Sequence, residues 1–123
     1  MILIDTNVFI DFLRNYSPAI DFFQSLNPEN VLFSAVTEAE LVAGKANDEN
    51  DKREKLLHFL HIWNKIPMTN PVASLAGDIV RQCGLEIPDA IIAATAVLNR
   101  ADLITHNVRD FKRVPGLKVR TPY

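Results

Sequence analysis

The chain has 123 residues, of which 48% are hydrophobic and 23% charged, with a formal net charge of −2 and an isoelectric point near 5.9. This length suffices for one hydrophobic core and excludes two, so a single domain spanning residues 1–123 is expected. The slightly acidic balance excludes a protein drawn to nucleic acid by its overall charge, so any phosphate binding has to be local.

The first seven residues are an apolar run that ends in an acid and two small polar residues. Ile2 to Ile4 predict a short strand that is apolar on both faces, as in the middle of a parallel sheet covered by helices on both sides. Asp5 would then lie at the carboxyl end of that strand. Ligand crevices of open α/β sheets lie there, so this carboxylate is predicted to serve chemistry rather than packing.

The middle of the chain predicts two short helices at residues 8–13 and 18–26, a strand at residues 31–33 and a helix over residues 38–46. Residues 52–63 then carry apolar side chains at helical spacing: Leu56, Phe59, Leu60 and Trp63. This stripe has two interpretations. It is either ordinary core or more apolar surface than a thin domain can bury, and on the second interpretation we expect a homodimer.

The remaining elements continue the alternation. Residues 65–67 predict a third strand, residues 71–83 a helix that stops at Gly84, and residues 89–98 an almost wholly apolar helix at the centre of the domain. Residues 103–104 predict a fourth strand, followed by a short basic helix around Asp110 and a last strand at residues 117–119. Short strands alternating with helices predict a three-layer α/β/α fold with a parallel sheet.

Cellular location is indicated by cysteine usage and by the length of the apolar runs. Cys83 is the single cysteine and cannot form an intramolecular disulfide, which is typical of a reducing compartment. No apolar run approaches the ~20 residues that a membrane-spanning helix needs. We therefore expect a cytoplasmic protein that is neither exported nor embedded in a membrane.

Several acids are predicted to converge on one edge of the sheet. Asp5 follows the first strand, Glu40 the second and Asp110 the fourth, while Asp89 begins the central helix. Each has a structural alternative. Glu40 would complete a capping box with Thr37, Asp89 suits the helix macrodipole, and Asp110 fits an exposed acid within a basic segment. The apolar helix that Asp89 begins favours a crevice, where an acid needs a counter-charge.

Such a cluster of carboxylates makes physical sense chiefly as a divalent metal site, because the acids would otherwise raise one another's pKa values. Oxygen ligands alone select the hard ions Mg²⁺ or Mn²⁺. The three histidines and the one cysteine lack the spacings of a zinc site.

Four segments of the chain together resemble the PIN-domain family, and most of all its VapC-type toxins: residues 2–7, residues 37–44, residues 88–94 and residues 105–111. The resemblance implies a ribonuclease that depends on Mg²⁺ or Mn²⁺, cleaves RNA and pairs with a protein antitoxin. It implies Asp5, Glu40 and Asp89 as metal ligands and catalytic residues. At the fourth position, where relatives differ, the sequence offers both Asn107 and Asp110, and Asp110 is counted among the expected ligands. Thr6 and Thr105, with Asn107, match polar positions beside the metal.

Three other functions fit the sequence less well. A phosphoryl-aspartate phosphatase needs a second acid two residues after the first, where this chain has Asn7. A receiver-type signalling domain needs paired acids after the first strand and a lysine after the last. A PIN-like module that only binds a partner would not need the three acids Asp5, Glu40 and Asp89, all of which are present.

Overall fold

The computed structural model describes all residues from 1 to 123. Every expected strand is present, with bounds that shift by one or two residues. The strands are β1 (Ile2–Ile4), β2 (Val31–Ser34), β3 (Asn64–Ile66), β4 (Asp102–Ile104) and β5 (Val119–Arg120). The α-helices are α1 (Thr6–Leu13), α2 (Ser17–Gln24), α3 (Ala35–Val42), α4 (Asn50–Leu60), α5 (Asn70–Cys83), α6 (Ile87–Leu98) and α7 (Val108–Phe111). Two 3-10 turns, η1 (Pro28–Asn30) and η2 (Lys45–Asp48), lie in the connections.

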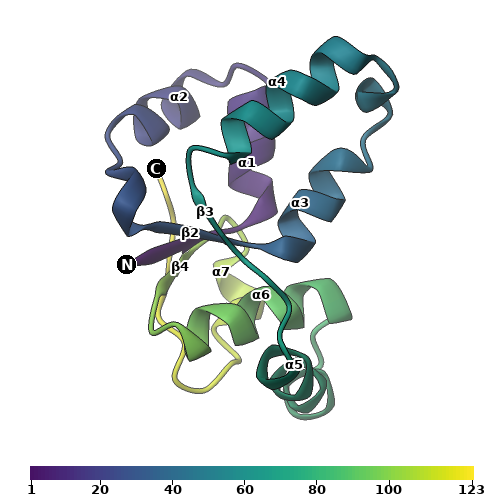
Figure 1. Ribbon diagram of the computed structural model, residues 1–123. Coiled ribbons are helices and arrows are strands. Elements are labelled where there is room, and N and C mark those ends of the chain that lie inside the picture. The colour runs from purple at the N-terminus through teal and green to yellow at the C-terminus, as the bar shows by residue number, and fades with distance from the viewer.

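The five strands form one parallel sheet in the order β3-β2-β1-β4-β5, with β1 at its centre (Figure 1). Leu3 of β1 pairs with Leu32 on one side and with Leu103 on the other. Because all strands run the same way, their carboxyl ends meet at one edge. The residues that follow β1, β2 and β4 therefore share that edge, as the sequence predicted.

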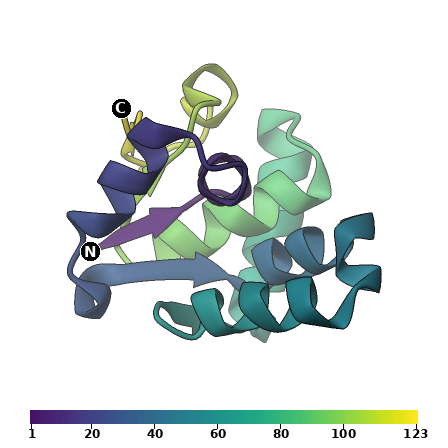
Figure 2. The same cartoon turned by 90° about the horizontal axis from the view of Figure 1, so that it is seen from above.

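Successive side chains of the strands enter two separate cores, which makes the fold three-layered. Leu3, Leu32 and Leu103 belong to the core that includes α5 and α6, whereas Ile4, Phe33 and Ile104 belong to the core that includes α1, α2 and α4. In Figure 1 the two sets of helices lie above and below the strands. Figure 2 shows β1 beside β2, with α1 leaving the end of β1. The expected α/β/α architecture is confirmed.

Helix α6 is the central helix that its composition predicted. Every residue from Ala90 to Ala96 is buried. The helix packs along α5 and against the sheet. None of the helices combines the length and the apolar character that crossing a bilayer requires.

The apolar stripe of α4 belongs to the core, so the surface argument for a homodimer was wrong. Leu56, Leu60 and Trp63 are 4%, 1% and 8% exposed. The ring of Phe59 stacks on Phe12 with centroids 4.2 Å apart. Helices α1 and α2 supply the aromatic surface that covers this stripe, and sequence periodicity alone does not show such a covering.

The capping box at Thr37 was also wrong. Helix α3 begins earlier, at Ala35, and its N-cap is Ser34, whose Oγ accepts a hydrogen bond from the backbone N–H of Val36 at 3.1 Å. Because β2 runs directly into α3, the last strand residue serves as the cap. Thr37 and Glu40 thus lie inside the helix, where both side chains are free for other contacts.

Candidate active site at the carboxyl edge of the sheet

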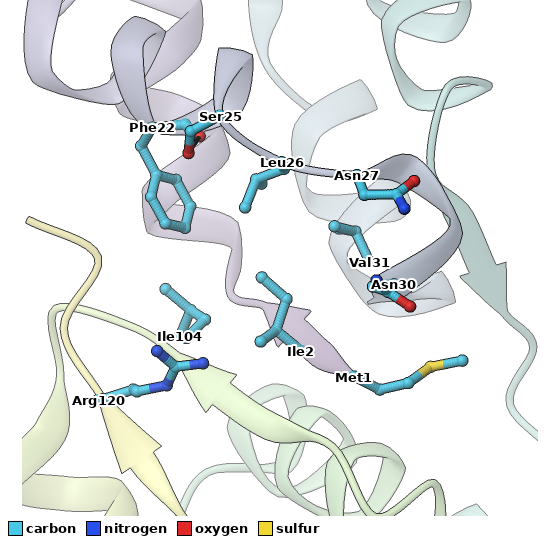
Figure 3. A pocket seen from close by; sticks show the side chains of 10 residues that line it. All are labelled: Met1, Ile2, Phe22, Ser25, Leu26, Asn27, Asn30, Val31, Ile104 and Arg120. Atoms are coloured by element: carbon cyan, nitrogen blue, oxygen red, sulfur yellow. Dashed lines mark hydrogen bonds between the residues drawn. The ribbon is translucent and has the colours of Figure 1, made fainter.

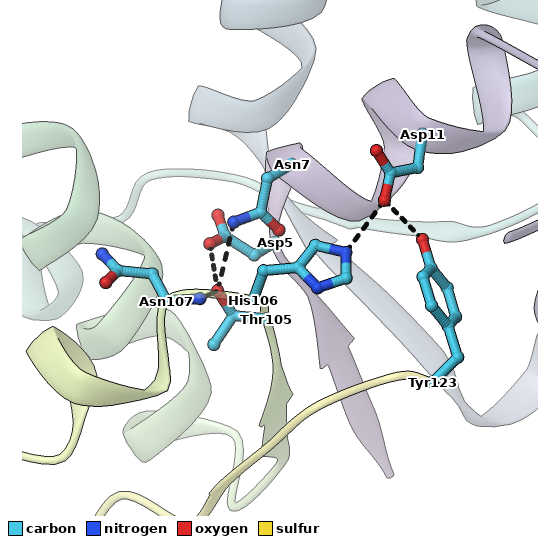
Figure 4. A network of polar contacts seen from close by, with 7 residues as sticks. All are labelled: Asp5, Asn7, Asp11, Thr105, His106, Asn107 and Tyr123. Carbon is cyan, nitrogen blue, oxygen red and sulfur yellow. Dashed lines mark hydrogen bonds and ion pairs between the residues drawn. The ribbon is translucent and has the colours of Figure 1, made fainter. Parts of the chain in front are cut away.

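Asp5 lies where β1 ends and α1 begins, and the residue is buried, with 5% exposure. Its Oδ1 accepts a hydrogen bond from the backbone N–H of Thr6 at 2.7 Å, and its Oδ2 accepts one from the hydroxyl of Thr105 at 2.7 Å (Figure 4). Burial raises the pKa of Asp5, and these two hydrogen bonds partly oppose the rise. The nearby negative charge of Glu40 also raises it.

Thr105 connects Asp5 to two asparagines. Its Oγ accepts hydrogen bonds from the backbone N–H of Asn107 at 3.0 Å and from the side-chain amide of Asn7 at 3.4 Å. The other amide atom, Asn7 Oδ1, is buried and has no hydrogen-bond partner within the chain. An unpaired buried acceptor is costly, so this oxygen needs a donor or a cation.

Glu40 is held by a pair of threonine hydroxyls. Thr6 Oγ donates to Glu40 Oε1 at 2.8 Å, and Thr6 Oγ lies 2.9 Å from Thr37 Oγ. A hydroxyl has a single proton to donate. Thr6 gives its proton to Glu40, so Thr37 is the donor in the threonine pair. This relay orients an otherwise exposed glutamate toward the edge of the sheet.

Asp89 is the third residue of α6 and is half-buried. Burial and the negative charges of Asp5, Glu40, Glu86 and Asp110 together raise its pKa to about 6. Asp5, Glu40 and Asp110 therefore lie within electrostatic reach of Asp89, and Glu86 does as well. The causes of this shift are burial and other acids, and a bound cation would offset both.

Asn107 and Asp110, the two candidates for the fourth position, form one hydrogen-bonded pair. Asn107 Nδ2 donates to Asp110 Oδ2 at 3.0 Å, and Arg113 donates to Asp110 Oδ1 at 2.6 Å. These contacts lower the pKa of Asp110, with the Asn107 hydrogen bond as the largest cause. Both oxygens of Asp110 are therefore engaged, and the structure links the two residues rather than choosing between them.

The donor set fits a hard divalent cation. It consists of carboxylates with raised pKa values and the unpaired Asn7 Oδ1, all oxygen atoms. As the side chains stand, no three acidic, histidine or cysteine residues form a closed ligand set. A bound cation would offset the repulsion between these like charges.

One hollow elsewhere on the surface has a different lining. The hollow in Figure 3, of about 380 Å³, lies among α2, β1 and the ends of β4 and β5, with Ile2, Leu26 and Ile104 among its apolar lining and Arg120 beside them. None of the acids at the carboxyl edge lines it. Of the two places, the acidic edge is the better candidate for a reaction.

Sequence reasoning placed the main acids and missed three of the residues around them. Asn7 was weighed only against a phosphatase, and Thr37 only as a helix cap. A usable signal existed for Thr37, because it precedes Glu40 by three residues and shares its helix face. Glu86, the residue before α6, gave no such signal, since its approach to Asp89 depends on how the chain enters the helix.

Comparison with known proteins places this geometry in a family. The family model described as "PIN domain" matches residues 2–117. Ribonuclease VapC19 of Mycobacterium tuberculosis is 33% identical over 96% of this chain and 98% of its own length. A toxin-antitoxin complex from Klebsiella pneumoniae contains a chain with 32% identity and a TM-score of 0.82, covering 100% of this chain and 98% of that one. In the crystal structure of FitAcB from Neisseria gonorrhoeae the identity is 30% and the TM-score 0.82, with coverage of 99% and 98%. The chain belongs to the PIN-domain family.

Proposed function

We propose that this protein is a metal-dependent endoribonuclease and the toxin of a VapBC-type toxin–antitoxin pair. The relatives named as ribonucleases, aligned over nearly the whole chain, support the ribonuclease activity. The observation that carries the metal dependence is the pKa of Asp89, raised to about 6 by burial first and then by the negative charges of four other acids. A site built of mutually repelling carboxylates is stable in its ionised form only with a cation.

Asp5, Glu40 and Asp89 would hold Mg²⁺ or Mn²⁺. Asn7 Oδ1 or Asp110, at the same edge of the sheet, would be the further ligand. When bound, such an ion supplies Lewis acidity that activates a water molecule and neutralises charge on the scissile phosphate. The other side chains of the site orient the carboxylates. Thr105 fixes Asp5, and the Thr37–Thr6 relay fixes Glu40.

Basic residues of α7 and its C-terminal end would hold the phosphates that flank the cleaved bond. Arg109 and Lys112 are exposed there, and Arg113 is tied to Asp110. They would supply locally the attraction that a chain of net charge −2 lacks. RNA is accordingly the proposed substrate, with specificity in groove shape and a few basic side chains.

The proposed protein partner is an antitoxin, supported by similar chains from toxin-antitoxin complexes. We also retain the homodimer as a proposal, although the α4 stripe no longer supports it. Exposed apolar side chains that a second copy could cover are Ile62, Met68 and Ile87, each more than half exposed. The cytoplasm is the proposed location.

The test is cleavage of a mixed RNA pool by purified protein in Mg²⁺ or Mn²⁺, with chelator as the control. Cleavage should require the metal, and Asp5→Asn, Glu40→Gln and Asp89→Asn should each abolish it while circular dichroism shows an intact fold. Asp21→Asn, a change to an exposed acid of α2, is the matched control and should cleave normally. Sequencing the new RNA ends would identify the target.

The same experiment decides between this proposal and the alternatives. A binding-only PIN module would leave RNA intact under all metal conditions. A phosphatase would release phosphate from a small phosphoester and leave the RNA chain intact. Persistent cleavage by all three acid variants would remove these residues from the reaction.

A further inference from the structure

A second polar group lies beside the acidic edge, formed by Asp11 of α1, His106 and Tyr123 (Figure 4). His106 Nε2 is 2.9 Å from Asp11 Oδ2. The hydroxyl of Tyr123, the last residue, donates to the same Asp11 oxygen at 2.7 Å. The rings of His106 and Tyr123 pack edge to face with centroids 5.2 Å apart. Tyr123 thus holds the Asp11–His106 pair in place through its hydroxyl and its ring.

This arrangement decides which nitrogen of the imidazole carries the proton. The hydrogen bond from Tyr123 is the largest cause of the lowered pKa of Asp11, so this carboxyl stays ionised and can only accept. His106 Nε2 must therefore be the donor. In the neutral ring the other nitrogen, Nδ1, is then an acceptor, and the chain offers it no hydrogen-bond partner.

The imidazole lies next to the groups that would hold the RNA strand. His106 directly follows Thr105, whose hydroxyl donates to Asp5. The backbone of His106 is therefore one residue away from a side chain that contacts the acidic edge. A positive charge on His106 would lower the pKa of Asp5, which places the ring within electrostatic reach of that carboxylate. The His106 side chain is 37% exposed. An RNA strand bound at the acids would therefore lie next to His106 Nδ1, an accessible hydrogen-bond acceptor in a fixed ring.

We propose that His106 Nδ1 accepts a hydrogen bond from a ribose 2′-hydroxyl of the bound strand, with Asp11 and Tyr123 as positioning residues that fix the ring. This inference rests on the proposed ribonuclease function, because it needs RNA at the acidic edge. The 2′-hydroxyl is the group by which a protein tells RNA from DNA at a given position. A phosphate contact is the competing role and would require a protonated ring.

Binding of fluorescent oligonucleotides at pH 8, above the ordinary histidine pKa of about 6.5, separates these roles. Ca²⁺ would serve as the cation, and gel analysis would verify that the RNA stays intact. A set of RNAs, each with one 2′-deoxy position, is compared with the all-RNA strand. Wild-type protein should bind one of them about fivefold more weakly, the effect of losing one hydrogen bond.

His106→Ala should bind that oligonucleotide and the all-RNA strand equally, and Asp11→Ala should do the same. Tyr123→Phe keeps the ring and loses the hydroxyl, so it should show a reduced penalty at the same position and no other. His61→Ala, a change to an exposed histidine outside this group, is the matched control and should keep the full wild-type penalty.

The inference would be overturned by a wild-type penalty that persists in His106→Ala. It would also be overturned by equal weakening of RNA and DNA binding by that variant, which marks a phosphate contact. Absence of RNA binding by the wild type would overturn it as well. Cleavage in Mn²⁺ is scored separately. A protein that shows the His106-dependent penalty but never cuts RNA would refute the ribonuclease and leave the 2′-hydroxyl contact standing.

Discussion

The hydroxyl of Thr105 donates a 2.7 Å hydrogen bond to Asp5, a residue 100 positions earlier in the chain. Both side chains are buried, at 0% and 5% exposure. The contact exists because β1 and β4 are neighbours in the sheet, so that their following residues meet. This hydrogen bond favours the ionised form of Asp5 and so opposes the rise in its pKa that burial causes.

Replacing Thr105 with Val should therefore destabilise the protein by about 1–3 kcal/mol at pH 7.5, the usual cost of leaving a buried polar group unpaired. Urea unfolding monitored by circular dichroism measures this free energy. Thr105→Ser keeps the hydroxyl and should recover most of the loss. Equal stability of the Val variant and the wild type would mean that the hydrogen bond does not support Asp5.

Asp89→Asn should raise the melting temperature of chelator-treated protein at neutral pH. The pKa of Asp89 is raised to about 6 in the folded protein, so folding favours the protonated form. The contribution of Asp89 to the free energy of unfolding is fully present below its unfolded pKa of about 3.9. This contribution declines as pH rises and is lost above the folded pKa near 6. Because the residue is only half-buried, solvent screening reduces the gain to the order of 1 kcal/mol.

Calorimetric scans at pH 4 and pH 7.5 check the sign of this effect. The advantage of Asp89→Asn should be present at pH 7.5 and nearly absent at pH 4. Saturating Mn²⁺ should reverse the ranking, because the ion stabilises the wild type by mass action and the variant lacks a ligand. Identical melting curves with and without the ion would make Asp89 an ordinary helix-end residue.

Thr37→Val should weaken metal-dependent cleavage without unfolding the protein. The change removes the hydroxyl that donates to Thr6, whose own hydroxyl holds Glu40. Groups that orient metal ligands typically contribute about 10–100-fold to affinity or activity. Steady-state cleavage rates at several Mn²⁺ concentrations measure the loss, and Thr37→Ser should behave as the wild type. An unaffected Val variant would show that Glu40 needs no relay.

Leu60→Ala should cost roughly 3 kcal/mol of stability, because Leu60 is a fully buried core residue at 1% exposure. Denaturant unfolding measures it. A loss well below 1 kcal/mol would mean that the apolar stripe of α4 is exposed surface rather than core. Light scattering at micromolar concentration tests the homodimer separately, and a monomeric mass would end that proposal.

The strands and the acids were predictable because both depend on short-range patterns. Apolar runs such as Ile2–Ile4 carry enough information to identify a buried parallel strand, and an acid that follows such a run lies at the carboxyl edge of the sheet. The nearly continuous apolar character of α6 likewise predicted its burial. These conclusions depended only on residues close together in the sequence.

The errors arose where a side chain had a choice of distant partners. Thr37 has the spacing of a helix cap, but Ser34 takes that role and leaves Thr37 for a contact with Thr6, 31 residues away. The α4 stripe was ambiguous because only packing shows that Phe12 and Phe23 cover Phe59. Hydrogen-bond networks and coverings of this kind depend on tertiary structure, which local periodicity does not specify.

The central claim is that the acidic edge binds a divalent cation, and isothermal titration with Mn²⁺ at neutral pH tests it most directly. Wild-type protein and Asp21→Asn should bind Mn²⁺ with measurable heat, whereas Asp5→Asn and Asp89→Asn should bind it far more weakly. Absence of binding to the wild type, or equal binding to the wild type and Asp89→Asn, would contradict the account.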